Sequence, residues 1–210
     1  LTDSAERADP VCRHFLQCGG CLAQHMTPAL YRDWKRGLVV EAFRHRGIDA
    51  EVGPPVIVDA ASRRRAFFGV ERRADEVTIG FREEGQHTLV NLMECPVLDP
   101  LIVAAVPGLR SLARRVMVDR AGGRLVVTRL DHGLDVSFDN GRKDLSPHEK
   151  AEIGALAQKM GLARLVVPQF ALARRHVAQP LQDGRVVPGA VPDLRQQGAL
   201  PAVAVELLEG

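Results

Sequence analysis

Apolar residues recur at helical spacing in the stretch that follows Thr27. Over residues 27–47 one helix face would carry five of them: Leu30, Trp34, Leu38, Ala42 and Phe43. Thr27 is a good N-cap, Pro28 suits the first helical position, and Gly47 can end the helix. The pattern predicts that this stripe enters a core and that the basic residues of the other face lie in solvent. Contact of that basic face with nucleic acid is the alternative.

Alternating apolar and polar residues predict strands over much of the remaining chain. The runs "PPVIVD" (54–59) and "RRRAFFGVERRADEVTIGFREEGQHTLVNL" (63–92) predict an antiparallel meander. The run 123–141 predicts a hairpin that turns at Asp131, His132 and Gly133. A further short strand, "LARLVV", is expected at 162–167.

Two more helices have clear start signals. Residues 98–118 read as a helix capped by Asp99 with Pro100 in its first turn, and Pro107 with Gly108 should break or kink it. Residues 146–161 are predicted to begin with a capping box of Ser146 and Glu149. From Pro168 onward the pattern decays, and the last 43 residues, with five prolines, show no sustained period.

Composition narrows the function only slightly. The chain of 210 residues has a net charge of +2 and 46% hydrophobic residues, enough for a core in one or two domains. Only four basic residues are lysines, and the arginines suit phosphates, although a GC-rich genome would give the same bias. The absence of a long apolar run or secretory pattern predicts a cytoplasmic protein without membrane contact. Because the chain begins at Leu1, we expect neighbouring sequence to be missing.

The four cysteines offer the clearest chemistry. Their spacing is C-x5-C-x2-C followed by one distant cysteine: Cys12, Cys18, Cys21 and Cys95. Disulfides need an oxidising compartment, which nothing in the sequence suggests. Structural zinc sites usually pair their ligands two and two, although His14 or His25 could replace a cysteine.

An iron–sulfur cluster fits the grouping of three cysteines and one better. The plant-type ferredoxin pattern is C-x4-C-x2-C with a distant fourth cysteine, one residue shorter in the first gap. Gly19 and Gly20 would let the loop wrap tightly and point N–H groups at sulfides, and Pro96 follows the last cysteine. His14 and His25 are expected to form local hydrogen bonds rather than act in catalysis.

The string "CRHFLQCGGCLAQHMTPALYRDWKR" (12–36) resembles the iron–sulfur RNA uracil-5-methyltransferases, which make 5-methyluridine in ribosomal and transfer RNA. The family's C-x5-CGGC-x2-QH pattern and its Tyr-x-x-Trp-Lys helix start are complete here: Cys12, Cys18, Gly19, Gly20, Cys21, Gln24, His25, Tyr31, Trp34 and Lys35. Residues 63–100 are similar to the family's central domain. The resemblance runs from about residue 10 to residue 167, and it implies a 4Fe–4S cluster on Cys12, Cys18, Cys21 and Cys95.

The catalytic parts of that family do not match this chain. The resemblance implies a cysteine that adds to C6 of uracil, a base that removes the C5 proton, and a methyl group from S-adenosylmethionine bound in a Rossmann-like domain. All four cysteines here are assigned to the cluster, and no glycine-rich cofactor signature follows. S-adenosylmethionine is therefore expected for the intact enzyme only, and this chain alone is expected to be inactive. Gln86 stands where the family often has serine.

The resulting prediction is an α+β fold with an antiparallel, β-rich central domain and flanking helices, stapled by the cluster, with the Rossmann-like domain largely missing. Its parts are a disordered remnant (1–11), a cluster loop (12–25), a helix that would pack on the catalytic domain (26–48), a central iron–sulfur and RNA-contacting domain (49–167), and an irregular tail that is an altered start of the methyltransferase domain (168–210).

The arginine-rich segment 62–73 is the candidate RNA surface. Its candidate RNA contacts are Arg63, Arg64, Arg65, Phe67, Arg72 and Arg73. Solvated arginines on an ordinary edge strand, with phenylalanines in the core, are the alternative. We expect a monomer that binds RNA, ribosomal rather than transfer RNA. A metal-stapled RNA-binding module without activity and an electron carrier remain as other function classes, and the arginines disfavour the carrier.

Overall fold

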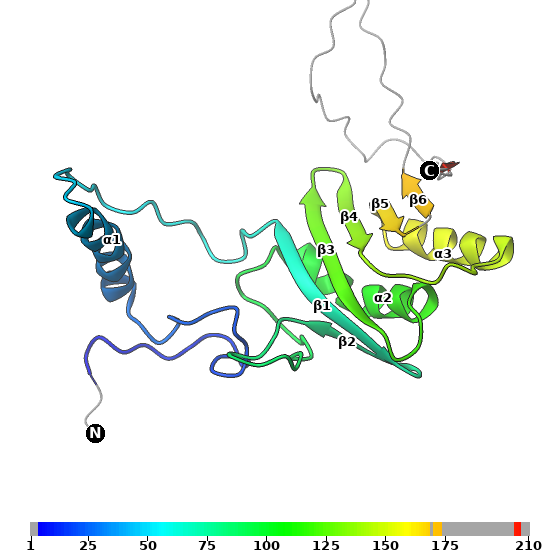
Figure 1. Cartoon of the computed structure of the whole chain (residues 1–210), viewed down its shortest axis with the longest axis horizontal. Coiled ribbons are helices and arrows are strands. Elements are labelled where there is room, and N and C mark those ends of the chain that lie inside the picture. Colours follow the sequence, from blue (N-terminus) through cyan, green and yellow to red (C-terminus); the bar gives the residue numbers. More distant parts are fainter. Residues whose placement is uncertain (1–3, 169, 174–203, 207–210) are drawn as a thin grey trace, which may run out of the picture.

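One mostly antiparallel sheet organises the chain (Figure 1). The structure is a computed structural model that describes residues 4–168, 170–173 and 204–206. The strands are β1 (Arg65–Arg73), β2 (Glu76–Gly80), β3 (Gly122–Leu130), β4 (Gly133–Phe138), β5 (Leu162–Val167), β6 (Phe170–Ala173) and β7 (Ala204–Glu206). They lie in the order β2-β1-β3-β4-β5-β6-β7, and only β4 and β5 are parallel neighbours. This arrangement confirms the α+β prediction.

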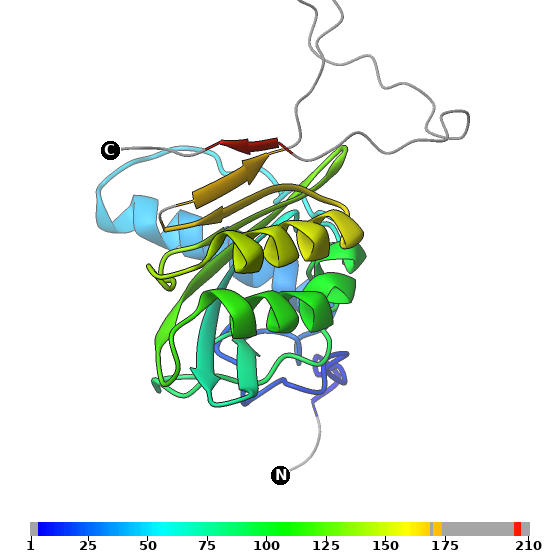
Figure 2. The ribbon, with the colours of Figure 1, turned by 90° about the vertical axis from the view of Figure 1, so that its right-hand side faces the viewer.

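Two helices cover one face of the sheet. Helices α2 (Pro100–Val116) and α3 (Pro147–Lys159) lie next to each other on that face (Figure 2). Strand side chains alternate, so that every second one points into the layer between sheet and helices. The largest fully buried side chains come from both layers: Phe68, Ile79, Leu98, Ile102, Leu109, Leu112, Met117, Leu125, Ile153 and Leu165. The opposite face of the sheet is left uncovered by these helices.

Local signals fixed both helix starts, as predicted. The Asp99 carboxylate accepts a hydrogen bond from the Leu101 N–H, at 2.9 Å. At the start of α3 the Ser146 hydroxyl accepts from the Glu149 N–H, while the Glu149 carboxylate accepts from the Ser146 N–H. The predicted β3–β4 hairpin is also confirmed, with Leu130 paired to Gly133 across the turn.

A break at Pro107 and Gly108, one of the two predicted outcomes, is wrong, because α2 continues through both residues to Val116. The other outcome, a kink, stays a prediction. A proline inside a helix removes one backbone hydrogen bond and crowds the preceding turn. Here the buried stripe of the helix runs on across it, with Ile102 and Val106 before the proline and Leu109 after it. Burial on both sides outweighs the lost bond.

Helix α1 (Pro28–His45) forms as predicted, with the Thr27 hydroxyl accepting from the Leu30 N–H. The prediction that its apolar stripe lies in a core is wrong for this structure. None of its residues is buried, and Leu38 is 50% exposed. Figure 1 shows why, since α1 stands well clear of the sheet and no described element packs on the stripe.

The strand predicted at 54–59 is also wrong. These residues form neither helix nor strand, and Val56 is 93% exposed. Two prolines in the run cannot donate ladder hydrogen bonds, and no strand lies beside it among the described residues. The segment therefore serves as an extended return from α1 to the sheet.

The two ends of the chain depart partly from the expected irregular structure. Within residues 4–11, the Ala8 N–H donates to the His25 carbonyl, and the Glu6 carbonyl accepts from Thr27. In the tail, expected to be irregular, the stretches 170–173 and 204–206 form β6 and β7, while its other residues from 169 onward lie outside the described part of the chain. Within the described residues, no helix has the length and apolarity needed to span a bilayer.

Candidate cluster site and nucleic-acid surface

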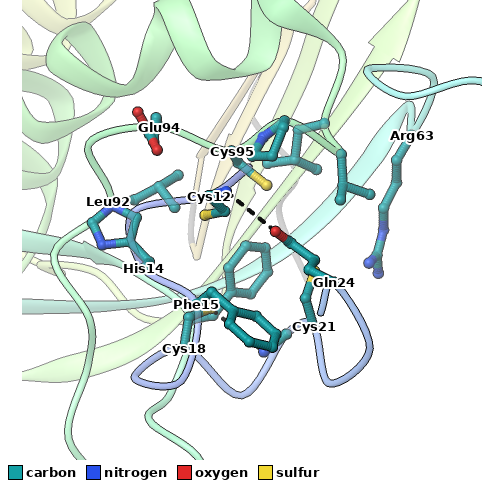
Figure 3. Close-up of a pocket in the computed structure, with 15 residues that line it drawn as sticks. Cys12, His14, Phe15, Cys18, Cys21, Gln24, Arg63, Leu92, Glu94 and Cys95 are labelled. Atoms are coloured by element: carbon teal, nitrogen blue, oxygen red, sulfur yellow. Dashed lines mark hydrogen bonds between the residues drawn. The ribbon is translucent and has the colours of Figure 1, made fainter. Parts of the chain in front are cut away.

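The four cysteines line one pocket, called the cysteine pocket below (Figure 3). Cys12, Cys18 and Cys21 come from the loop before α1, whereas Cys95 comes from the segment between β2 and α2. Aromatic and aliphatic side chains complete the walls: Phe15, Phe81, Leu92, Val97 and Leu98. The structure therefore brings together the residues that the sequence assigned to one site. All four thiols are free and partly exposed.

The glycines of the cysteine loop allow it to dock tightly on the segment that follows β2. The Gly19 N–H donates to the Arg82 carbonyl at 2.9 Å, and Cys18 pairs with Glu83 in an antiparallel bridge. A Cβ on Gly19 would lie only 3.2 Å from that same carbonyl oxygen. The Gly20 N–H points at the Cys18 sulfur, 3.4 Å away, which is the kind of contact predicted for a sulfur-binding loop.

A second set of hydrogen bonds fixes the loop to the Cys95 segment. His14 is the one buried polar side chain of the described residues, and its Nε2 accepts from the Met93 N–H at 3.1 Å. The Arg13 N–H donates to the Glu94 carboxylate at 2.7 Å. The His14 side chain therefore forms a structural hydrogen bond, as expected, but with a partner that is distant in sequence rather than local. Spacing alone could not have paired it with Met93, since 79 residues separate the two.

Two of the thiols are held in their neutral form by their surroundings. Burial raises the pKa of the Cys12 thiol, and the neighbouring Cys95, Glu94 and Cys21 raise it further. Burial likewise raises the pKa of Cys18, with Cys21, Cys12 and Cys95 adding to it. Crowded thiols of this kind lose their protons when a cation compensates the charge. Within the described residues, however, no three Cys, His, Asp or Glu side chains converge in the geometry of a single-ion site.

The predicted RNA-binding arginines do not form one surface. Arg63, Arg64 and Arg65 precede or begin β1, whereas Arg72 and Arg73 end this nine-residue strand. At about 3.3 Å per residue, Arg65 and Arg73 are roughly 26 Å apart along the strand.

Each of these arginines makes a contact within the protein, including Arg63 with the Arg65 carbonyl, Arg65 with Thr128 and Arg73 with Glu71. Arg64 pairs with Asp131 at 2.7 Å, and Arg72 donates to the Met117 carbonyl at 2.6 Å. Phe67, by contrast, is 49% exposed on the uncovered face of the sheet. The Arg65 guanidinium lies 5.6 Å from the centre of its ring.

Comparison of the sequence with known proteins identifies relatives of this chain. No protein-family model matches the chain. It is 38% identical over 165 residues to an uncharacterized RNA methyltransferase of Brucella suis, covering 79% of this chain and 40% of the relative. It is 36% identical over 168 residues to an uncharacterized RNA methyltransferase of Rhizobium meliloti, covering 77% and 40%. It is also 32% identical over 165 residues to the 23S rRNA (uracil(1939)-C(5))-methyltransferase RlmD of Halomonas elongata, covering 77% and 34%.

The chain belongs to the RNA uracil-5-methyltransferase family. It spans about 40% of the length of the first curated relatives that it matches. In this family context, the cysteine pocket and the uncovered sheet face are the two features of the described residues that invite a functional explanation.

Proposed function

We propose that this chain supplies the iron–sulfur and RNA-recognition part of an S-adenosylmethionine-dependent RNA uracil-5-methyltransferase that acts on ribosomal RNA. The convergence of Cys12, Cys18, Cys21 and Cys95 on one pocket carries the first half of the proposal. The relative named for methylation of a 23S rRNA uracil supports the second half and favours ribosomal over transfer RNA.

The donor set of the cysteine pocket fits a polynuclear cluster. Four thiols surround one pocket, and in the described part of the chain no three ligating side chains converge on a single point. An iron–sulfur cluster is wider than one ion and takes thiolates from several sides. When bound, a 4Fe–4S cluster would supply a covalent cross-link and a compact negative charge.

The surrounding residues of this chain would orient the thiolates. The Gln24 side chain accepts from the Cys12 N–H at 3.2 Å and fixes the start of the loop. The Gly20 N–H faces the Cys18 sulfur, where it would stabilise a thiolate. His14 holds the neighbouring Met93 backbone, and so sets the position of Cys95 two residues later. Apolar side chains form much of the pocket wall around the sulfurs, which are partly exposed in this structure.

Methyl transfer itself is assigned to the part of the enzyme that carries a nucleophilic cysteine and the S-adenosylmethionine site. Because the proposal uses every cysteine of this chain as a ligand, the chain alone transfers no methyl group to RNA. Incubation with labelled S-adenosylmethionine and ribosomal RNA tests this point, and uracil methylation by the isolated chain would overturn it.

Metal and sulfide analysis of the anaerobically purified chain tests the cluster. We expect about four irons and four sulfides per chain. Cys95→Ser should lose most of this iron and sulfide. Met93→Leu is the matched control, because its side chain is 62% exposed and lies two residues from Cys95. Full iron occupancy in Cys95→Ser would refute the ligand assignment. One zinc ion without sulfide would instead favour a metal-stapled RNA-binding module.

A further inference from the structure

One face of the sheet carries exposed side chains in an ordered array. The helices α2 and α3 lie on the other face, so the odd-numbered residues at the start of β1 point away from the core. Across the β1–β3 ladder, Arg65 lies opposite Thr128, Phe67 opposite Val126, and Gly69 opposite Arg124. We call this side, with its centre at Phe67, the open face.

Phe67 and Arg65 form a preorganised pair on the open face. The Arg65 Nε donates to the Thr128 hydroxyl at 3.2 Å, which holds the guanidinium beside the Phe67 ring. A half-exposed phenylalanine on a strand gains little by packing within this chain. An aromatic ring with an adjacent guanidinium offers a flat surface on which a nucleobase can stack.

A groove begins at Phe67 and runs along the open face. It has a volume of about 500 Å³, and its lining includes Phe67, Gly69, Arg82, Leu89 and Arg124. That size lies within the range that accommodates a small organic ligand such as a nucleotide. Gly122 and Gly123 also line the groove and leave it free of side chains at those two positions.

The charges of the open face suit an anion. Arg65 and Arg124 are exposed, and Arg82 reaches the groove from the segment after β2. Two acidic residues, Glu71 and Asp139, also line the groove, and each has a partner within the protein. Glu71 lies 3.6 Å from Arg73, and Asp139 accepts from the Arg124 N–H at 2.6 Å. Asp135, which faces Thr128 across the β3–β4 ladder, is paired with Arg164.

We propose that the open face binds single-stranded RNA, with one base stacked on Phe67 and the backbone phosphates near Arg65 and Arg124. This inference rests on the proposed function, because it names where the RNA of that enzyme would lie. An unpaired strand is required, because a base within a duplex cannot expose its flat face to the ring. Of the residues that the sequence suggested, Arg65 and Phe67 belong to this site, while Arg82 and Arg124 are additions from the structure.

Fluorescence anisotropy with a labelled, mixed-sequence single-stranded RNA of about twelve nucleotides tests the proposal on the full chain. Phe67→Leu should weaken binding roughly 5- to 150-fold, the range measured for loss of one aromatic stacking partner. Phe67→Tyr keeps the ring and should bind as the original chain does. Val118→Ala is the control for loss of an exposed apolar side chain, because Val118 is 48% exposed and lies outside the groove.

A charge substitution provides a second, independent readout. Arg124→Gln should lower the slope of log affinity against log salt by roughly 0.7, the value for one phosphate contact with a single strand. Arg115→Gln is its control, since Arg115 is exposed near the end of α2. Salt dependence that is the same in both variants would argue against a phosphate at Arg124.

Several results would overturn this inference without touching the proposed cluster, because iron and sulfide are measured on the same samples. They are RNA binding that Phe67→Leu leaves unchanged, equal binding of single-stranded and duplex RNA, and no RNA binding at all by a chain that holds its iron. Sedimentation of the chain covers one further outcome. Self-association that Phe67→Leu abolishes would show that a second copy, rather than RNA, occupies the open face.

Discussion

Replacing His14 with alanine should release the cysteine loop from the Cys95 segment. The substitution removes the acceptor for the Met93 N–H, which lies in a partly buried contact. A buried donor left without a partner costs about 1–3 kcal/mol. Taking about 2 kcal/mol, the equilibrium between docked and undocked loop should shift about 30-fold toward the undocked state. The sheet should remain folded, because the helices α2 and α3 and the strands form its core without His14.

Amide hydrogen exchange of the metal-free chain measures this shift directly. In His14→Ala, the docking amide of Gly19 and the Met93 amide should exchange about 30-fold faster. His14→Gln keeps an acceptor and should restore part of the protection. His45→Ala is the matched control, because His45 is an exposed residue of α1 that pairs only with Glu41 among the described side chains. Unchanged exchange in His14→Ala, or equal acceleration in the control, would refute the reasoning.

Two further predictions concern the stability of the sheet and of α3. Gly80→Ala should lower the free energy of unfolding, measured in urea, by about 3 kcal/mol. The added Cβ would lie 1.8 Å from the Val90 carbonyl oxygen and would force apart backbone segments that are hydrogen-bonded to each other. Gly122→Ala, whose Cβ meets nothing closer than 3.5 Å, should cost far less, and equal losses would contradict the steric argument. Hydrogen bonds from Ser146, and to a smaller extent from Arg142, lower the pKa of Glu149 to about 2. The stabilising contribution of the Glu149 carboxylate is therefore present above about pH 4.5 and is lost as the pH falls toward 2. The difference in unfolding free energy between the original chain and Glu149→Gln should therefore shrink from about pH 6 to about pH 3, and a constant difference would exclude this role.

The sequence predicted those elements whose signals are local. Thr27, Asp99 and Ser146 each accept a backbone N–H within three residues, so each cap could be recognised from a short stretch of sequence. The β3–β4 hairpin follows from its turn residues in the same way. The features that sequence reasoning missed depend on distant partners. The apolar stripe of α1 is exposed because no described element packs on it. Pro107 is tolerated within α2 because residues on both sides of it are buried, which the spacing of apolar residues does not show.

The two candidate sites also differ in how far the sequence predicted them. The cysteine spacing and the family resemblance named all four residues of the pocket, and the structure places them together. Their ligation to a cluster remains a prediction. The groove on the open face could not be predicted from the sequence. Arg82 and Arg124 line it with Phe67 only because of strand register and loop docking. Arg64, Arg65 and Arg72 looked equivalent in the sequence. In the structure Arg64 bonds to Asp131 and Arg72 to the Met117 carbonyl, whereas Arg65 bonds to Thr128 beside the Phe67 ring on the open face.

The path of the chain around the cysteine pocket has a mechanical consequence. The chain leaves the pocket after Cys21, runs through α1, and returns where the Ala61 N–H donates to the Pro96 carbonyl beside Cys95. A cross-link between Cys21 and Cys95 would close this excursion into a ring and remove about 4.5 kcal/mol of unfolded-chain entropy at 25 °C. Both ends of the excursion would then be anchored at one point. A force that a partner exerts on the apolar side of α1 would therefore act on the chain at the pocket. Helix α1 could change its orientation only about that anchored point.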